Sequence, residues 1–402
     1  MNREPFCTPP KSWAPKLNPS WVRLSRRYRR RQLFRKQRLV EVVSQNTEVL
    51  EQAVSAGHGV LITPNHSAHY DGPALYAAAD RMDLPLYFMI AWQVFAMASR
   101  FERWAMQHMG CFSIDREGTD RRAFKQAVKT LRYGAHPLVI FPEGYIYHTT
   151  DYVTSFREGA AAIALSATRR ADRPVVVIPC GIKFWYLDDP TNELRKALRQ
   201  IEVKLHLRSI ESLPLAERIH RLAEAALALK ELDYLGHTRS GRLRQRVAHL
   251  LHTVLAQLEQ RHQLSVCDRS PPERVKALRQ CVIRKLEQQP RNVSANGQLG
   301  QLQCDMEDLF FAMQLYSYRG DYLADEPSVE RLAETVDKFE EDILRLEYPN
   351  VRGRRRVAVR FGQPIEVDGS RQRPTGAAEL TCIMQNRVQA LVDELNSQSP
   401  KR

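Results

Sequence analysis

The chain has 402 residues, of which 43% are hydrophobic and 26% are charged. This composition is that of an ordinary globular protein, and it excludes a disordered, collagen-like or disulfide-rich chain. Sixty Lys and Arg residues against 46 Asp and Glu residues give a formal net charge of +14. The charge favours an anionic partner, which is a nucleic acid, a membrane of acidic lipids or a phosphorylated substrate.

The cysteines and the apolar segments indicate the compartment. Seven cysteines are scattered along the chain without a C-x-x-C pair, which is typical of reduced thiols in the cytosol. The longest apolar run, residues 84–98, contains a proline and a glutamine and is shorter than the roughly 20 residues that span a bilayer. The N-terminus shows no secretory or lipoprotein signal. We therefore expect a cytoplasmic protein that does not cross a membrane.

Residues 1–54 are predicted to form a basic N-terminal arm and helix. Within them, residues 21–40 carry nine Arg or Lys side chains interleaved with apolar ones, a composition suited to a helix lying on an anionic membrane surface. A solvated basic helix that only packs onto the core is an alternative, and an RNA-binding arm is another. Because no RNA-recognition aromatic motif or zinc knuckle accompanies the segment, we do not expect a nucleic acid partner.

Residues 55–188 alternate short apolar runs with amphipathic stretches. The strands are predicted at 59–63, 85–90, 111–115, 137–141 and 174–179, and the helices near 72–80, 92–108, 119–133 and 157–168. Such alternation, with nearly continuous apolar strands, predicts an α/β fold with a mainly parallel sheet covered by helices. Ligands of such sheets bind at the loops that follow the carboxyl ends of the strands.

Residues 189–350 are predicted to be a large helical insertion. Apolar positions recur with helical period at 214–232, 242–260, 272–288 and 328–347, and turns are expected at 271–272, 290–298 and 320–321. We find no internal repeat of fixed period. Residues 351–402 then return to the α/β pattern, with a strand at 355–367 and a closing helix at 377–395.

An imidazole and a carboxylate stand five residues apart in the loop PNHSAHYDGP, residues 64–73. If His66 and Asp71 meet across a turn, the carboxylate fixes the tautomer of the imidazole and stabilises the cation that forms when the ring accepts a proton. The pair is then a base suited to activating a hydroxyl. Alternatively, Asp71 only caps the helix that follows it, and His66 is an exposed loop residue.

Three further loops follow predicted strands. In FPEG (141–144), Glu143 lies beside a glycine, where it can approach a ligand closely. In GCFSIDR (110–116), Arg116 offers a fork of donors that suits a phosphate monoester. The alternative for this arginine is an ordinary ion pair with an acidic neighbour, Asp115, Glu117 or Asp120. VIPCG (177–181) is a buried strand that enters a proline turn, and such a segment alone indicates packing.

In this order and at these spacings, the four loops resemble the four motif blocks of the glycerolipid acyltransferase family, most closely those of the 1-acylglycerol-3-phosphate (lysophosphatidic acid) acyltransferases. NHSAHYD is similar to the NHxxxxD block, GCFSIDR to the arginine block, FPEG to the third block and VIPCG to the apolar-proline block. SFREGAAAIA (155–164) and VRFGQPIEV (359–367) also resemble stretches of that family. The resemblance covers residues 55–185 and 355–395.

The resemblance implies an O-acyltransferase of phospholipid biosynthesis that moves a fatty acyl group from a thioester to a hydroxyl of a lysophospholipid such as 1-acylglycerol-3-phosphate. It makes His66 the general base and Asp71 the group that holds the imidazole. It assigns Arg116 to the acceptor phosphate, and Glu143 with Gly144 to the acceptor glycerol. It implies no metal and no cofactor beyond the co-substrate, acyl-CoA or an acyl carrier protein thioester, because a thioester is already activated.

One departure from the family pattern concerns the acceptor. Family members commonly continue FPEG into Thr-Arg-Ser, which adds a phosphate-binding arginine, whereas Tyr145 follows here. Either Arg157 or Lys183 supplies that cation, or the acceptor is glycerol 3-phosphate or another lysolipid.

Two other functions stay open at this point. His66, His69 and Asp71 form an HxxHxD pattern with His148 further on, which permits a metal site. A catalytically silent, basic binding module is the competing class of function. For the enzyme, a lipid acceptor and the basic segment together predict a peripheral protein on the cytoplasmic face of an anionic membrane. The aromatic region 84–106 either adds apolar contact to that surface or forms a buried core helix.

Overall fold

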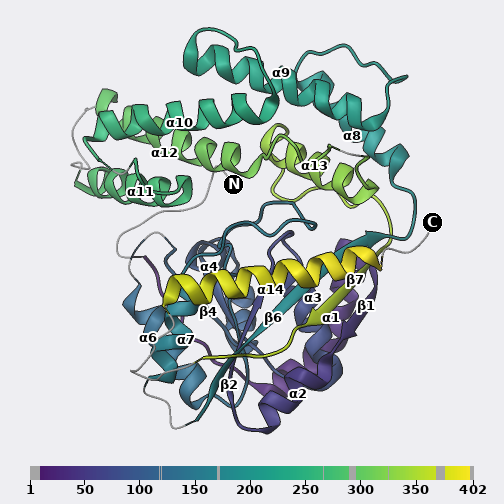
Figure 1. Cartoon of the computed structure of the whole chain (residues 1–402), viewed down its shortest axis with the longest axis vertical. Coiled ribbons are helices and arrows are strands. Elements are labelled where there is room, and N and C mark those ends of the chain that lie inside the picture. The colour runs from purple at the N-terminus through teal and green to yellow at the C-terminus, as the bar shows by residue number, and fades with distance from the viewer. Residues whose placement is uncertain are drawn as a thin grey trace. The chain divides into compact units, whose positions relative to one another are not determined.

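A computed structural model describes residues 10–116, 118, 120–169, 173–265, 267–288, 296–324, 326–367 and 376–398, without the side chains of 296–298. Glu117, one expected partner of Arg116, and residues 290–295 of an expected turn lie outside this set. The described residues form two compact units (Figure 1), one comprising those of 10–11 and 191–350 and the other those of 12–190 and 351–398. We call them the helical unit and the α/β unit.

The α/β unit is built on an eight-stranded sheet, with the strand order β1-β7-β6-β2-β5-β3-β4 and β8 beside β6. The strands are β1 (Leu39–Gln45), β2 (Gly59–Pro64), β3 (Tyr87–Ala91), β4 (Cys111–Ile114), β5 (Leu138–Val139), β6 (Val175–Tyr186), β7 (Arg355–Phe361) and β8 (Ile365–Glu366). All pairs are parallel except those of β6 with β7 and β8. The predicted α/β fold with a mainly parallel sheet is confirmed.

Helices cover both faces of this sheet, as expected for strands that are apolar on both sides. One face packs against α1 (Pro19–Gln37), α2 (Thr47–Ser55), α3 (Asp71–Ala79), the short turn η1 (Asp80–Met82), α4 (Trp92–Met97) and α5 (Arg100–His108). The other packs against α6 (Arg121–Tyr133), α7 (Gly159–Thr168) and α14 (Ala377–Ser397). No helix among the described residues is long and apolar enough to cross a membrane.

Several elements differ from the predicted ones. The strand β1 was not predicted, and it pairs with β7, so the sheet begins before residue 55. The helix expected at 92–108 is two helices, because Ser99 caps α5 by accepting from the Glu102 N–H while Glu102 accepts from the Ser99 N–H. The region is also divided in burial: Phe95 of α4 is buried, whereas Phe101 of α5 is exposed.

The helical unit contains α8 (Thr191–Lys204), α9 (Leu215–Leu235), α10 (Leu243–His262), α11 (Pro271–Gln288), α12 (Asn296–Ser317) and α13 (Val329–Asp342). Of these, α8 and α12 were not predicted. The expected turn at 290–298 overlaps the first residues of α12. Pro271 and Pro272 open α11, where proline costs no helix hydrogen bond.

Three helices of this unit share a local pattern of buried residues. Three buried arginines stand 28 residues apart near the starts of successive helices, Arg218, Arg246 and Arg274. Four residues after each arginine comes a buried leucine, Leu222, Leu250 and Leu278. Each arginine is followed directly by Ile or Val. The helices α9, α10 and α11 therefore have the same residue types at these three positions, at a spacing of 28 residues.

Each of these arginines fastens its helix to the preceding one. Its Nε and Nη2 atoms bind both oxygens of a glutamate near the end of that helix, at distances from 2.6 to 3.0 Å. The three pairs are Arg218–Glu202, Arg246–Glu231 and Arg274–Glu259. A bidentate pair satisfies both buried charges in one fixed geometry, so the repeated element is the helix junction itself.

Candidate active site

The order of the parallel strands places three of the predicted loops at one edge of the sheet. His66 follows β2, Arg116 follows β4 and Glu143 follows β5. Because β2, β5, β3 and β4 are consecutive parallel neighbours, the carboxyl ends of these strands lie at the same edge. This shared edge is what allows residues from distant loops to meet.

His66 and Asp71 are in contact. The Nδ1 atom of His66 lies 3.0 Å from Oδ2 of Asp71, which also accepts the N–H of Ala68 at 2.8 Å. Asp71 is fully buried at the first position of α3, whereas the imidazole is 20% exposed. The carboxylate therefore both stabilises the loop and binds the inner ring nitrogen, which leaves Nε2 as the basic atom of the ring.

Glu143 binds the backbone of this loop at His66. Its carboxylate accepts the backbone N–H of His66 at 2.6 Å and that of Thr154 at 3.0 Å. Phe141, two residues earlier, places its ring 4.2 Å from the imidazole centroid. Burial raises the pKa of Glu143 to about 8, against the lowering effect of the two backbone hydrogen bonds. The glutamate thus links the FPEG loop to the loop that carries the imidazole.

Arg116 reaches the FPEG loop as well. Its Nη1 donates to the carbonyl oxygen of Gly144 at 2.8 Å, and its guanidinium carbon lies 4.4 Å from the ring centroid of Tyr145. The guanidinium of Arg157 lies 5.0 Å from the same centroid. Gly144 has φ of +77°, and a Cβ there would meet Arg157 Nε at 2.8 Å. Two arginines thus share one aromatic ring next to the glycine.

Asp120 binds backbone N–H groups on both sides of the segment between β4 and α6, which carries Arg116. One of its oxygens accepts the Ala123 N–H at the start of α6, and the other accepts the Asp115 N–H at 3.0 Å. The carboxylate of Asp120 thus acts as a helix cap that fixes the β4–α6 connection.

Lys183 and Ser67 are both buried and contact acidic side chains. Lys183, one of the two candidates for an additional phosphate cation, is buried and forms an ion pair with Asp151. Ser67 is buried, and its Oγ lies 3.5 Å from Oδ1 of Asp71. These contacts leave Arg157, which shares a ring with Arg116, as the better placed candidate cation.

Two histidines of the possible metal site, His69 and His148, lie close together in the α/β unit. The rings of His69 and His148 lie 5.8 Å apart between centroids. The structure therefore brings these two histidines of the pattern together, and the metal site stays a prediction.

Sequence reasoning missed Asn65, Thr154 and the role of Tyr145. Asn65 precedes the imidazole and is bonded to β6, and Thr154 supports Glu143 through its backbone. A motif match does not identify such residues, because their contribution lies in contacts with strands and loops far away in the sequence.

A comparison with protein-family models gave a match to the family described as Acyltransferase, over residues 41–183. Residues 41–183, which lie in the α/β unit, are therefore similar to the proteins of this family. The match covers about a third of the chain and includes most of β1, all of β2 to β5, most of β6 and all of the predicted site residues. A search of curated proteins gave no match.

Proposed function

We propose that the protein transfers a fatty acyl group from a thioester to a hydroxyl of a lysophospholipid such as 1-acylglycerol-3-phosphate, in phospholipid biosynthesis. The observation that carries this proposal is the contact between the partly exposed imidazole of His66 and the buried carboxylate of Asp71. Deprotonation of an alcohol requires a base that is held in one tautomer and has a nitrogen able to accept the proton. In His66, Nδ1 is bound by Asp71 and Nε2 is that nitrogen. The acyltransferase match supports O-acyl transfer as the reaction class.

In the proposed reaction, Nε2 of His66 removes the proton from the acceptor hydroxyl while the oxygen attacks the thioester carbonyl. The new C–O bond forms as the C–S bond breaks, and the imidazolium returns the proton to the leaving thiolate. Asp71 stabilises the imidazolium between these two steps. The step needs neither a metal nor a cofactor beyond the thioester of CoA or acyl carrier protein.

The proposed acceptor phosphate binds between Arg116 and Arg157. Their guanidinium groups contact the same Tyr145 ring, and a ring face attracts a cation. Held there, the two groups can direct donors to one phosphate. This arrangement would replace the arginine that the family places after FPEG.

Glu143 and Gly144 are proposed to position the acceptor glycerol, and the contacts of Glu143 suggest how. Because its carboxylate already binds two backbone N–H groups, we propose that it acts by holding the His66 loop in place. Gly144 then allows the close approach of Arg157 that a side chain would obstruct.

Transfer of a radiolabelled acyl group by the wild type, His66→Ala and the control His58→Ala tests the reaction. The wild type and His58→Ala should acylate an acceptor, and His66→Ala should lose about 10²–10⁴-fold in kcat. A panel of lysophosphatidate, glycerol 3-phosphate, and neutral and zwitterionic lysolipids identifies the acceptor. Activity that disappears on exhaustive chelation would replace the base mechanism with a metal site. If no acceptor is acylated, the enzyme proposal fails and a silent binding module takes its place.

We also propose that α1 and α5 dock on an anionic membrane at its cytoplasmic face. An apolar patch is formed by Trp21, Leu24, Tyr28, Phe101 and Trp104. Leu24 is 77% and Phe101 64% exposed, and the rings of Trp21 and Trp104 are 4.8 Å apart. An apolar surface of this kind on a basic helix is typical of interfacial binding.

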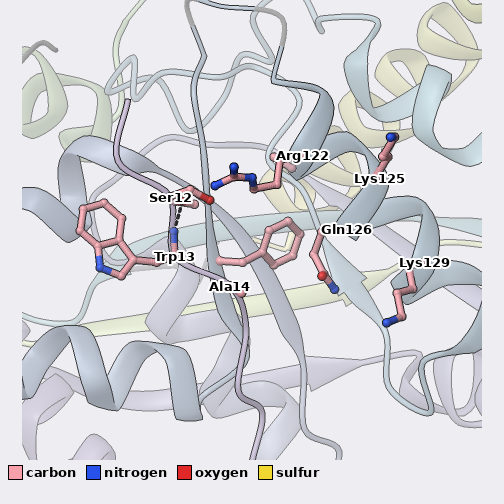
Figure 2. A pocket seen from close by; sticks show the side chains of 10 residues that line it. Ser12, Trp13, Ala14, Arg122, Lys125, Gln126 and Lys129 are labelled. Atoms are coloured by element: carbon pink, nitrogen blue, oxygen red, sulfur yellow. Dashed lines mark hydrogen bonds between the residues drawn. The ribbon is translucent and has the colours of Figure 1, made fainter. Parts of the chain in front are cut away.

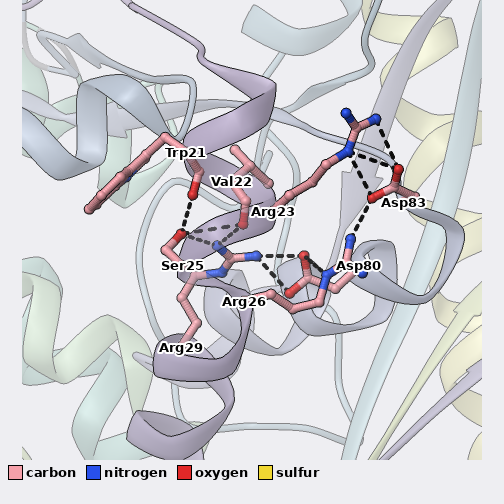
Figure 3. Close-up of polar contacts among 8 residues, drawn as sticks. All are labelled: Trp21, Val22, Arg23, Ser25, Arg26, Arg29, Asp80 and Asp83. Carbon is pink, nitrogen blue, oxygen red and sulfur yellow. Dashed lines mark hydrogen bonds and ion pairs between the residues drawn. The ribbon is translucent and has the colours of Figure 1, made fainter.

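Part of the basic charge of α1 holds the helix to its own unit (Figure 3). Arg29 pairs with Asp80 at 2.5 Å, and Arg23 and Arg26 pair with Asp83. Other basic side chains of α1 are exposed and form no ion pair with a described residue: Arg27, Arg30, Arg31, Arg35 and Lys36. The proposed membrane contact therefore depends on this second group.

Flotation with anionic and neutral vesicles tests the docking. The triple variant Arg30→Gln/Arg31→Gln/Arg35→Gln should bind anionic vesicles at least ten-fold more weakly, since each charge near such a surface contributes about 1 kcal/mol. The control Lys204→Gln/Arg284→Gln/Arg387→Gln removes the same charge elsewhere and should bind as the wild type. Equal binding of all three proteins, or binding that salt does not weaken, would contradict the proposal.

A further inference from the structure

The α/β unit contains a cavity of about 260 Å³ beside the edge strand β4 (Figure 2). Its walls come from three parts of the chain: the N-terminal segment Ser12–Ala14, the strand residues Phe112 and Ser113, and one side of α6. None of the predicted site residues lines this cavity. The cavity is therefore distinct in its residues from the base and the phosphate pair described above.

The N-terminal wall is fixed in place by hydrogen bonds. The Trp13 N–H donates to Oγ of Ser113 at 2.7 Å, and the Ser113 N–H donates to the Trp13 carbonyl at 3.0 Å. The amide of Gln107 donates to the Ala14 carbonyl at 2.7 Å, and the Trp13 ring stacks on Phe95 with centroids 5.3 Å apart. The cavity is thus pre-formed, as binding sites for small molecules generally are.

The helix wall of the cavity is strongly cationic. Arg122, Lys125 and Lys129 follow one another at spacings of three and four residues, which places them on one side of α6 with Gln126. No lining residue is acidic, and none of the three cations forms an ion pair with a described residue. Three such charges next to an apolar wall favour a ligand that carries several phosphates and a flat, weakly polar group.

The cavity is large enough for only one end of a ligand of the size of a cofactor. Whole ligands occupy sites of about 300–1,000 Å³, and this volume suits a single nucleoside rather than an acyl chain. The β4–α6 connection that leads into this wall also carries Arg116.

We infer that the cavity binds the nucleotide end of coenzyme A, with Arg122, Lys125 and Lys129 on its phosphates. This inference rests on the proposed acyl transfer, and it selects acyl-CoA over acyl carrier protein as the donor. The adenosine end of CoA combines a flat base with a 3′-phosphate and a 5′-diphosphate. Those are the features that the apolar wall and the three cations would recognise.

Titration calorimetry on the full chain tests the site with adenosine 3′,5′-bisphosphate, CoA, 3′-dephospho-CoA and pantetheine as probes. The first two should bind, dephospho-CoA more weakly, and pantetheine not detectably. Arg122→Gln/Lys125→Gln/Lys129→Gln should weaken CoA binding by at least ten-fold. The control Lys204→Gln/Arg284→Gln/Arg387→Gln should bind CoA as the wild type does.

Because calorimetry needs no turnover, its outcome is independent of the proposed reaction. CoA binding that the cavity variant loses supports the site even if no acceptor is acylated. Equal CoA binding by the cavity variant and the control, equal affinity for dephospho-CoA, or no binding at all would overturn it. The proposal would also be overturned if the cavity variant kept its affinity for CoA but lost its affinity for inorganic phosphate or for anionic vesicles. The three cations would then bind another anion.

Discussion

The side-chain amide of Asn65 forms hydrogen bonds with both backbone groups of Ile182, as a residue of a neighbouring strand would. Its Nδ2 donates to the Ile182 carbonyl at 3.0 Å, and the Ile182 N–H donates to its Oδ1 at 2.7 Å. The strand β2 ends at Pro64, opposite Cys180, while β6 continues to Tyr186. Asn65 thus extends the pairing of the two strands by one side chain, and it fixes the backbone immediately before His66.

Replacing Asn65 by Ala should impair both stability and activity. Two buried backbone groups of Ile182 would lose their partners, at a cost of about 1–3 kcal/mol each, and the loop before His66 would no longer be fixed. We expect a lower urea midpoint and at least a ten-fold lower kcat. The control Asn386→Ala, which removes an exposed side-chain contact with Cys382, should change neither. An Asn65→Ala enzyme with normal kcat would show that the anchor is dispensable.

Substituting Asp71 by Asn should leave the fold largely intact but lower kcat by about 10²–10⁴-fold, because an amide does not stabilise the imidazolium. Steady-state kinetics with a thioester donor measures this, with circular dichroism to confirm folding. Asp188→Asn removes a carboxylate from a surface pair with Arg354 and serves as the control. Similar kinetics for both variants would exclude Asp71 from the mechanism.

Replacing Tyr145 by Leu should raise KM for a phosphorylated acceptor by about ten-fold, since each arginine loses a ring contact worth roughly 0.5–2 kcal/mol. Tyr145→Phe keeps the ring and should behave as the wild type. The KM for the thioester should be unchanged in both. If Tyr145→Leu lowers only kcat, the ring does not organise the phosphate site.

Glu143 should make stability fall with rising pH. Its pKa in the folded protein, about 8, is above its ordinary value of 4.5, so the folded state holds a proton that the unfolded chain releases between these values. The stabilising effect of this group is complete below about pH 4.5 and is lost as pH rises through 8. Glu143→Gln does not ionise, so this part of the decline should disappear.

Urea unfolding between pH 5 and 9 measures the effect of Glu143 on the free energy of unfolding. All five tryptophans lie in the α/β unit, so their fluorescence reports on that unit. Glu158→Gln, at an exposed position, is the control and should keep the decline of the wild type. A decline in Glu143→Gln as steep as in the wild type would assign it to other groups.

The junctions of the helical unit can be probed at Arg246. Arg246→Met leaves the buried charge of Glu231 unpaired, which should cost about 3–5 kcal/mol, whereas Arg246→Met/Glu231→Leu should recover much of it. Far-UV circular dichroism should show an earlier urea transition for the single variant, while tryptophan fluorescence should not shift. Lys196→Met, from an exposed pair, should alter neither signal. A single variant as stable as the double one would show that this pair does not fasten the junction.

Many of the helices and strands could be predicted from the sequence, and the reason is local. A buried strand or a helix with one buried face requires apolar residues at fixed spacing, so runs such as residues 59–63 and 242–260 identify their own elements. The half-buried edge strand β1 and the helix α12 lack so clear a pattern, and both were missed. The 28-residue spacing of the buried arginines was not predicted, because α9, α10 and α11 share only a few residue types at equivalent positions.

The motif residues could be identified from the sequence alone, but their partners could not. The bond from His66 to Glu143 and that from Asn65 to Ile182 join residues 77 and 117 positions apart. The Tyr145 ring between two arginines and the cavity wall supplied by Trp13 arise in the same way. Spacing along a chain reports which side chains are buried together in one element. Which groups meet across elements depends on strand order and register, and these are decided only when the whole sheet packs.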